Sequence, residues 1–253
     1  MEIKPWYPAD YQLAVSNTFS EKEVDAFLSM PGCAPRFVYG VLMLPTVLKY
    51  YIDMDENVDI SRNMTQATLF GYKLYHFAEE SPPVIARSSD PEAAVEGMLI
   101  FGLDEAQRNS IYDLEGGLME LVSVEVEICQ KERHHHHLRS MRTVEEVGTF
   151  AWKGPKEGLI EMGTTAWPID SYLESQFYEH IVRSQNSAWC ESQLPLQSQS
   201  ESSSGEYNMH SMQGRGGTSP PSRRRGSGSS HSRSSRFQSS LERILEEMQI
   251  VDE

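Results

Sequence analysis

A single glutamate at the end of a predicted helix is the residue in this sequence best placed for proton transfer. Glu115 closes the segment "SIYDLEG" four residues after Ile111, so both side chains project from the same helix face. If Ile111 faces the core, Glu115 is partly removed from water, and burial raises the pKa of a carboxyl group toward that of a general base working near neutral pH. Asp113 lies off that face. A solvated carboxylate at a helix end is the alternative, and helical spacing does not decide between the two.

The second candidate is a turn in the stretch "RFVYGVLMLP", where a short apolar strand runs into a tyrosine and a glycine. Backbone N–H groups lose their strand partners at such a turn, and a glycine allows close approach of a ligand. The turn could therefore bind a small anion through the main chain of Tyr39, Gly40, Val41 and Leu42. An ordinary strand-to-helix turn, with Pro45 opening the helix, would give the same pattern.

Other reactive residue types occur without the spacing that a metal, phosphate or nucleophilic site requires. The histidines 134–137 are adjacent, so they cannot all face one ion as two histidines four apart on a helix can, and we expect a solvated loop. Cys33, Cys129 and Cys190 include no CxxC pair, which predicts free thiols. The segment around Lys153 lacks the order of a phosphate-binding loop. We therefore expect no metal and no cofactor.

The elements that would position these residues predict an α+β protein. We expect strands in "RFVYG", "ATLFGYKLYHF", "VEGMLIFGL", "LVSVEVEI" and "EVGTFAW", with a bend or bulge at Gly71. Helices are expected after Pro45 and in "EAQRNSIYDLEG" behind Asp104 and Gln107. A closing helix is expected in "PIDSYLESQFYEHIVRS", whose Tyr172, Phe177 and Ile181 could pack on the body. Because strands and helices do not alternate strictly, the expected fold is a small mixed or antiparallel β-barrel with flanking helices and a disordered C-terminal tail.

Composition divides the 253-residue chain into four segments. We expect a leader with one short helix (1–35), a folded domain (36–190), a disordered Ser/Arg-rich tail (191–240) and a short amphipathic helix (241–253). In the leader, Ser20 and Glu23 form a capping box for a helix that packs through Val24, Phe27 and Leu28. The aromatic run "KPWYPADY" before it is expected to be irregular.

Charge is unevenly distributed along the chain. The net charge is −15, of which the first 190 residues carry −14, whereas Ser203 to Arg236 carry +5. An acidic domain does not favour non-specific contact with nucleic acid or anionic membranes. Neither an apolar run of about 18 residues nor a signal peptide is recognisable, so we expect a cytoplasmic protein, with nuclear access left open. If a protein partner binds, residues 191–253 are the segment we expect it to bind.

Five segments in order resemble the gamma-glutamylcyclotransferase superfamily. They are "FVYGVLM", "ATLFGYKLYHF", "PPVIARS", "AAVEGMLIFGL" and "IYDLEG" with its trailing "VSVEVEI". The similarity is to the branch of gamma-glutamylamine cyclotransferase-like and plant avirulence-induced-gene-like proteins, and it extends from about Arg36 to Trp152.

The resemblance implies a small β-barrel with a pocket between the turn and Glu115. By position, Tyr39, Gly40, Val41 and Leu42 would bind the α-carboxylate of a γ-glutamyl group through backbone N–H donors. Glu115 would be the acid and base that lets the substrate's α-amine attack its own γ-carbonyl. The products would be 5-oxoproline and a free amine or amino acid, and the reaction requires no metal or cofactor.

Several positions depart from the family's pattern. Val41 stands where the family usually has threonine or serine, Met119 and Leu121 stand where tyrosine and arginine are common, and Pro82 replaces a tyrosine. Two hypotheses therefore stay open. The first is a cyclotransferase, an acyl-transfer enzyme, acting on γ-glutamyl amines or peptides. The second is an inactive member of the fold that acts as an interaction protein through its tail.

Overall fold

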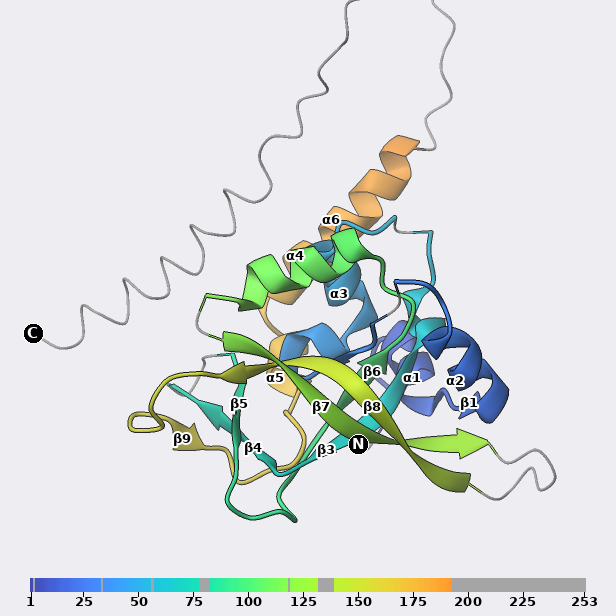
Figure 1. Ribbon diagram of the computed structural model, residues 1–253. Helices are drawn as coiled ribbons and strands as arrows, with labels where there is room; N and C mark the ends of the chain where they lie inside the picture. Colours follow the sequence, from blue (N-terminus) through green and yellow to red (C-terminus); the bar gives the residue numbers. More distant parts are fainter. Residues whose placement is uncertain are drawn as a thin grey trace, which may run out of the picture. The chain divides into compact units, whose positions relative to one another are not determined.

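The structure is a computed structural model that describes residues 1, 3–32, 34–55, 57–77, 82–117, 119–131 and 139–192 (Figure 1). Met1 to Leu194 form one compact unit. The predicted tail beyond residue 192 and the predicted helix 241–253 lie outside the described residues, as do Cys33 and the histidines 134–137.

Five strands of the described chain close into a barrel. Their order around it is β7 (Met119–Lys131), β3 (Met64–Phe70), β6 (Ala94–Ile100), β2 (Arg36–Val38) and β8 (Arg139–Trp152), and β8 pairs again with β7. The β2 and β8 strands run parallel, and the other neighbours in the barrel run antiparallel. A short strand, β1 (Phe19–Ser20), adds parallel to the far end of β7. The predicted α+β class and mixed barrel are confirmed.

A second, three-stranded sheet lies beside the barrel. It consists of β5 (Val84–Arg87), β4 (Tyr72–His76) and β9 (Ile160–Glu161), with β4 in the middle. The chain passes from β3 to β4 through Gly71, whose φ of +75° is a conformation that suits glycine. The predicted bend at this glycine is therefore confirmed, because it is the point at which the chain leaves the barrel.

Three helices lie together at one end of the barrel, in the upper part of Figure 1. They are α3 (Pro45–Tyr51), α4 (Glu105–Glu115) and α6 (Gln176–Ser192). Pro45 occupies the first turn of α3, and the side chains of Asp104 and Gln107 form a capping box at the start of α4. A second capping box, of Ser20 and Glu23, opens α2 (Glu21–Leu28). These helix starts are confirmed.

The leader and the closing segment contain differences from expectation. The leader has a further helix, α1 (Ala9–Ser16), which begins within the run predicted to be irregular. Its N-cap is Pro8 and no side chain caps it, so the usual start signal is missing, and packing against β3 stabilises it instead. The single closing helix is in fact two, α5 (Asp170–Leu173) and α6.

Two expected core side chains are exposed. Leu28 is 37% exposed and Phe177 is 45% exposed. Leu28 is the last residue of α2, and Phe177 lies in the first turn of α6, where its ring meets Tyr172 at a centroid distance of 6.4 Å. The other predicted contacts hold: Val24 and Ile181 are fully buried.

The core has two parts that meet at one residue of the predicted turn. One cluster lies under α3 and α4, and the other fills the barrel around Phe37, Leu69 and Leu99. Tyr39 packs against both clusters. The turn after β2 is therefore held where the helical layer meets the barrel.

Candidate functional site

The turn after β2 depends on Gly40 for two reasons. Tyr39 is still extended, and Gly40 then opens a 3₁₀ helix, η1 (Gly40–Met43), with a φ of +66°. A Cβ at Gly40 would lie 2.7 Å from Cγ of the buried Pro83. Glycine therefore supplies both the left-handed conformation and the room that Pro83 occupies. The first N–H groups of η1 have no acceptor within that helix.

Tyr39 is fixed by its hydroxyl group. This group donates a hydrogen bond of 2.7 Å to the carbonyl oxygen of Phe150 in β8. Burial, together with the charge of Glu115, holds the pKa of Tyr39 well above its usual range, so the phenol stays protonated at any physiological pH. The side chain thus ties the turn to the barrel and also lies within the field of the predicted base.

Glu115 occupies the partly buried environment, one of the two that the helix pattern left open. Ile111 is fully buried, and Glu115, one turn later at the end of α4, is half-buried. Burial raises the pKa of Glu115 from 4.5 to about 7. Asp113 points away and is exposed. The carboxyl group of Glu115 can therefore gain and lose a proton near neutral pH, which is what a general acid and base requires.

A second tyrosine near Glu115 was missed by the sequence reasoning. Burial is the main cause of the raised pKa of Tyr51, at the end of α3, and the charges of Tyr50 and Glu115 add to it. The missed signal was helical spacing, because Leu44, Leu48 and Tyr51 lie on one face that packs in the same core cluster. The structure therefore brings both Tyr39 and Tyr51 into the electrostatic range of Glu115, from two other elements.

The positions that depart from the family's pattern have different surroundings. Val41 is half-buried and packs against the core cluster under α3. Met119 is buried in the same cluster, and it supplies apolar surface where a hydroxyl was expected. Leu121 is 42% exposed and Pro82 is exposed. The apolar replacements at 41 and 119 thus make this region drier.

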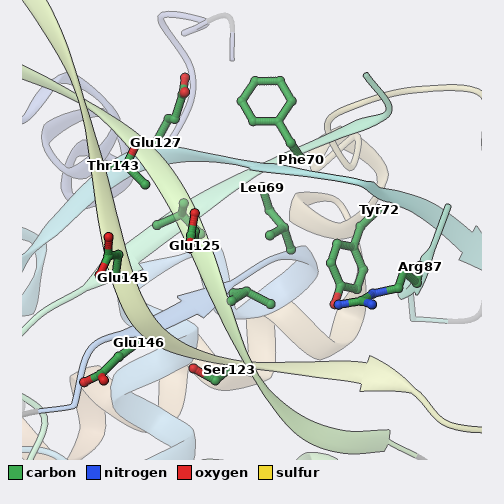
Figure 2. Close-up of a pocket in the computed structure, with 12 residues that line it drawn as sticks. Leu69, Phe70, Tyr72, Arg87, Ser123, Glu125, Glu127, Thr143, Glu145 and Glu146 are labelled. Carbon is green, nitrogen blue, oxygen red and sulfur yellow. The ribbon is translucent and has the colours of Figure 1, made fainter. Parts of the chain in front are cut away.

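A hollow lined by charged side chains lies elsewhere among the described residues. It has a volume of about 540 Å³ and opens between the end of β3, the start of β4, the end of β5 and the β7–β8 hairpin (Figure 2). Charged side chains line it: Arg87, Glu125, Glu127, Glu145 and Glu146. Neither Glu115 nor any residue of the turn 39–42 lines this hollow.

The described residues contain no group of three or more histidine, cysteine, aspartate or glutamate side chains arranged to hold a metal ion. Cys129 is a free thiol. None of the helices in the described ranges combines the length and the apolar character needed to cross a membrane.

Comparison with known proteins gives a family match over residues 36–167, to the model described as gamma-glutamyl cyclotransferase, AIG2-like. No curated protein matches the chain.

Solved structures with similarity include two Arabidopsis thaliana proteins. One has 18% sequence identity and a TM-score of 0.38, covering 64% of this chain and 95% of its own. The other has 25% identity and a TM-score of 0.37, covering 70% and 98%. A yeast gamma-glutamyl cyclotransferase specific to glutathione has 11% identity and a TM-score of 0.33, covering 67% and 91%. Because the family match spans more than half of its 253 residues, the chain belongs to the AIG2-like gamma-glutamyl cyclotransferase family.

Proposed function

We propose that this protein releases 5-oxoproline from γ-glutamyl amines or γ-glutamyl peptides, with Glu115 as general acid and base. One observation carries the proposal: a half-buried carboxyl group whose pKa is raised to about 7, within electrostatic range of the tyrosine of the Tyr39–Gly40 turn. Membership in the family supports the type of reaction. The substrate and the role of Glu115 are our inference.

In the proposed complex, the turn binds the α-carboxylate of the γ-glutamyl group. Main-chain N–H groups of Gly40, Val41 and Leu42 would donate to its oxygens, and the open turn of a 3₁₀ helix favours a negative charge. This interaction needs no side-chain hydroxyl at position 41. Tyr39 would keep the turn in place through its bond to Phe150.

Proton transfer would then proceed through one carboxyl group. The Glu115 carboxylate accepts a proton from the substrate's α-ammonium, and the neutral amine attacks the γ-carbonyl carbon to form a five-membered ring. The C–N bond to the departing amine breaks as Glu115 returns the proton to that nitrogen. The regenerated carboxylate then takes the second proton from the ring nitrogen and passes it to the released amine or to solvent. The nucleophile belongs to the substrate, so the protein need only hold a reactive conformer and move a proton.

The test is an assay of 5-oxoproline release by the purified full-length chain. A panel of γ-glutamyl amines and γ-glutamyl peptides would be compared for the native protein, Glu115→Gln and Asp113→Asn. We expect release from at least one compound, its loss in Glu115→Gln and its retention in Asp113→Asn, which removes an exposed carboxylate from the same helix. No release from any compound would leave the inactive interaction protein as the better account.

A further inference from the structure

Arg36 and Arg108 lie near each other, Arg36 at the start of β2 and Arg108 near the start of α4. Tyr39 and Glu115 lie at the opposite ends of these two elements. Arg36 is the first residue of β2, and its side chain lies over Gly148 of β8, where a Cβ would come within 2.5 Å of the Arg36 Nη1. The glycine therefore leaves room for the guanidinium. Nη1 reaches the carbonyl oxygens of Pro35 at 3.3 Å and Ala34 at 3.5 Å, both long contacts.

The Nε of Arg36 is buried and has no hydrogen-bond partner among the described residues. Burial lowers the pKa of Arg36, and the positive charge of Arg108 lowers it further, so the two guanidinium groups lie close enough to repel. A buried donor without a partner and two like charges together are both unfavourable. The site is therefore short of negative charge.

Arg108 lies near the start of α4, and its side chain bonds to the segment that precedes β2. Its Nη1 donates to the carbonyl oxygens of Gly32 and Leu103, each at 2.6 Å. Open space surrounds the Cβ position of Gly32, where no atom lies within 4 Å. Both arginines are half-buried, so part of each remains exposed to solvent.

No carboxylate neutralises this pair within the described part of the chain. Among the described residues, Lys4, Lys73 and Arg142 each form an ion pair with an acidic side chain. Neither Arg36 nor Arg108 forms such a pair within the described ranges. Asp104, one turn before Arg108, uses its carboxylate to accept from the N–H of Gln107.

We propose that Arg36 and Arg108 form a binding site for a small oxyanion, a phosphate or carboxylate group. The planar guanidinium presents paired N–H donors that match the oxygens of either group. The anion would offset the repulsion between the arginines and offer an acceptor on the side of Arg36 that lacks one.

This site is separate from the proposed substrate site. Arg108 precedes Glu115 by seven residues of α4, which corresponds to about 10 Å along the helix. Arg36 likewise precedes the Tyr39 turn by the length of β2. An anion held by the two arginines would therefore be an additional ligand, and its binding does not rest on the proposed catalysis.

Isothermal titration calorimetry of the full-length chain tests this proposal. Inorganic phosphate and acetate would be titrated in turn at one fixed ionic strength, so that the two arms distinguish a phosphate from a carboxylate ligand. The variants are Arg108→Gln, Arg108→Lys and Arg36→Lys. The matched control is Arg62→Gln, which removes an equal charge from an exposed arginine paired with Asp59.

We expect saturable binding of at least one anion by the native chain. Arg108→Gln should weaken it by tenfold or more, because a charge-assisted hydrogen bond is lost. Both lysine variants should weaken binding less, since they keep the positive charge and lose only the paired N–H donors of the guanidinium. Arg62→Gln should bind as the native chain does. Absence of binding for both anions would overturn the proposal. So would unchanged binding by Arg108→Gln, or equal weakening by Arg62→Gln.

Discussion

Two acidic regions of this protein differ in how many carboxylates they hold and in how much water reaches them. The hollow between the β3–β4 corner and the β7–β8 hairpin is lined by four glutamates, of which Glu125, Glu145 and Glu146 are exposed. The region under α3 and α4 holds Glu115, half-buried among apolar and aromatic side chains.

The difference shows that burial, rather than the number of acids, makes a carboxyl group useful for proton transfer. An exposed carboxylate remains hydrated and holds its charge. At Glu115, burial is the cause that raises the pKa to about 7. The hollow thus offers space and negative charge, whereas the region under α3 and α4 offers a group that can exchange a proton near neutral pH.

Substitutions of Gly40, in the turn beside Glu115, and of Gly71, at the corner beside the hollow, should differ most in how far they destabilise the fold. Gly40 and Gly71 both have positive φ, but only Gly40 is also in close contact with another residue, Pro83, while no atom lies within 4 Å of the Cβ position of Gly71. We expect Gly40→Ala to destabilise the fold by about 2–5 kcal/mol, from backbone strain and overpacking, and Gly71→Ala by about 1–2 kcal/mol. Urea unfolding of both variants measures this, and equal losses would show that Pro83 yields easily.

Shortening the carboxyl side chain should affect only the buried region. Glu115→Asp withdraws the carboxyl group by one methylene, and a displacement of about 1 Å at a reacting group costs on the order of 100-fold in rate. The same change at the exposed Glu125 should leave 5-oxoproline release within about twofold of native. Steady-state kinetics of the two variants measure the contrast. A similar loss from both would mean that the hollow, and not the region of Glu115, binds the substrate.

Removing the buried charge should stabilise the fold above neutral pH. The folded-state pKa of Glu115, about 7, exceeds the ordinary value of 4.5, so the folded state holds an extra proton between these values. The contribution of Glu115 to the free energy of unfolding is therefore most favourable below about pH 4.5 and is lost as the pH rises to 7. At pH 8 we expect Glu115→Gln to be more stable than native by on the order of 2–3 kcal/mol. At pH 4.5 the gain should vanish.

Denaturant unfolding at both pH values checks this expectation, with Asp113→Asn as the exposed control on the same helix. A gain of equal size at pH 4.5 and pH 8 would show that the glutamine acts through packing rather than through the charge.

Neutralising the open hollow should have the smallest effect. Glu145→Gln and Glu146→Gln remove exposed charges, so we expect 5-oxoproline release within about twofold of native and stability within about 0.5 kcal/mol. Activity and unfolding assays of the double variant measure both. A tenfold loss of activity would mean that these carboxylates contribute to the reaction.

Local signals in the sequence predicted much of the fold. The capping boxes at Ser20 and Asp104, Pro45 at the start of a helix and the bend at Gly71 each depend on a few neighbouring residues. The α1 helix was missed because Pro8 provides no cap and the helix is stabilised by distant packing on β3. Closure of the barrel likewise depends on the pairing of β2 with β8, whose partners Arg36 and Gly148 lie far apart in the chain.

Single candidate residues of the site could be recognised in the sequence, but the residues that surround them in the fold could not. The spacing of Ile111 and Glu115 allowed either a partly buried or a solvated carboxylate, and the structure shows the partly buried one. Helical spacing could show that Tyr51 lies on the buried face of its helix, but not that this face lies near Glu115. Nor could it place the charged hollow, because its lining comes from β3, β4, β5, β7 and β8.

The pH dependence of kcat/KM tests the central claim most directly. For the native chain and a γ-glutamyl compound that it cleaves, we expect the rate to fall tenfold per pH unit below a midpoint near 7, because only the Glu115 carboxylate can accept the proton. A midpoint near 4.5, or a profile that is level from pH 5 to 8, would contradict the role of a buried Glu115 as the base.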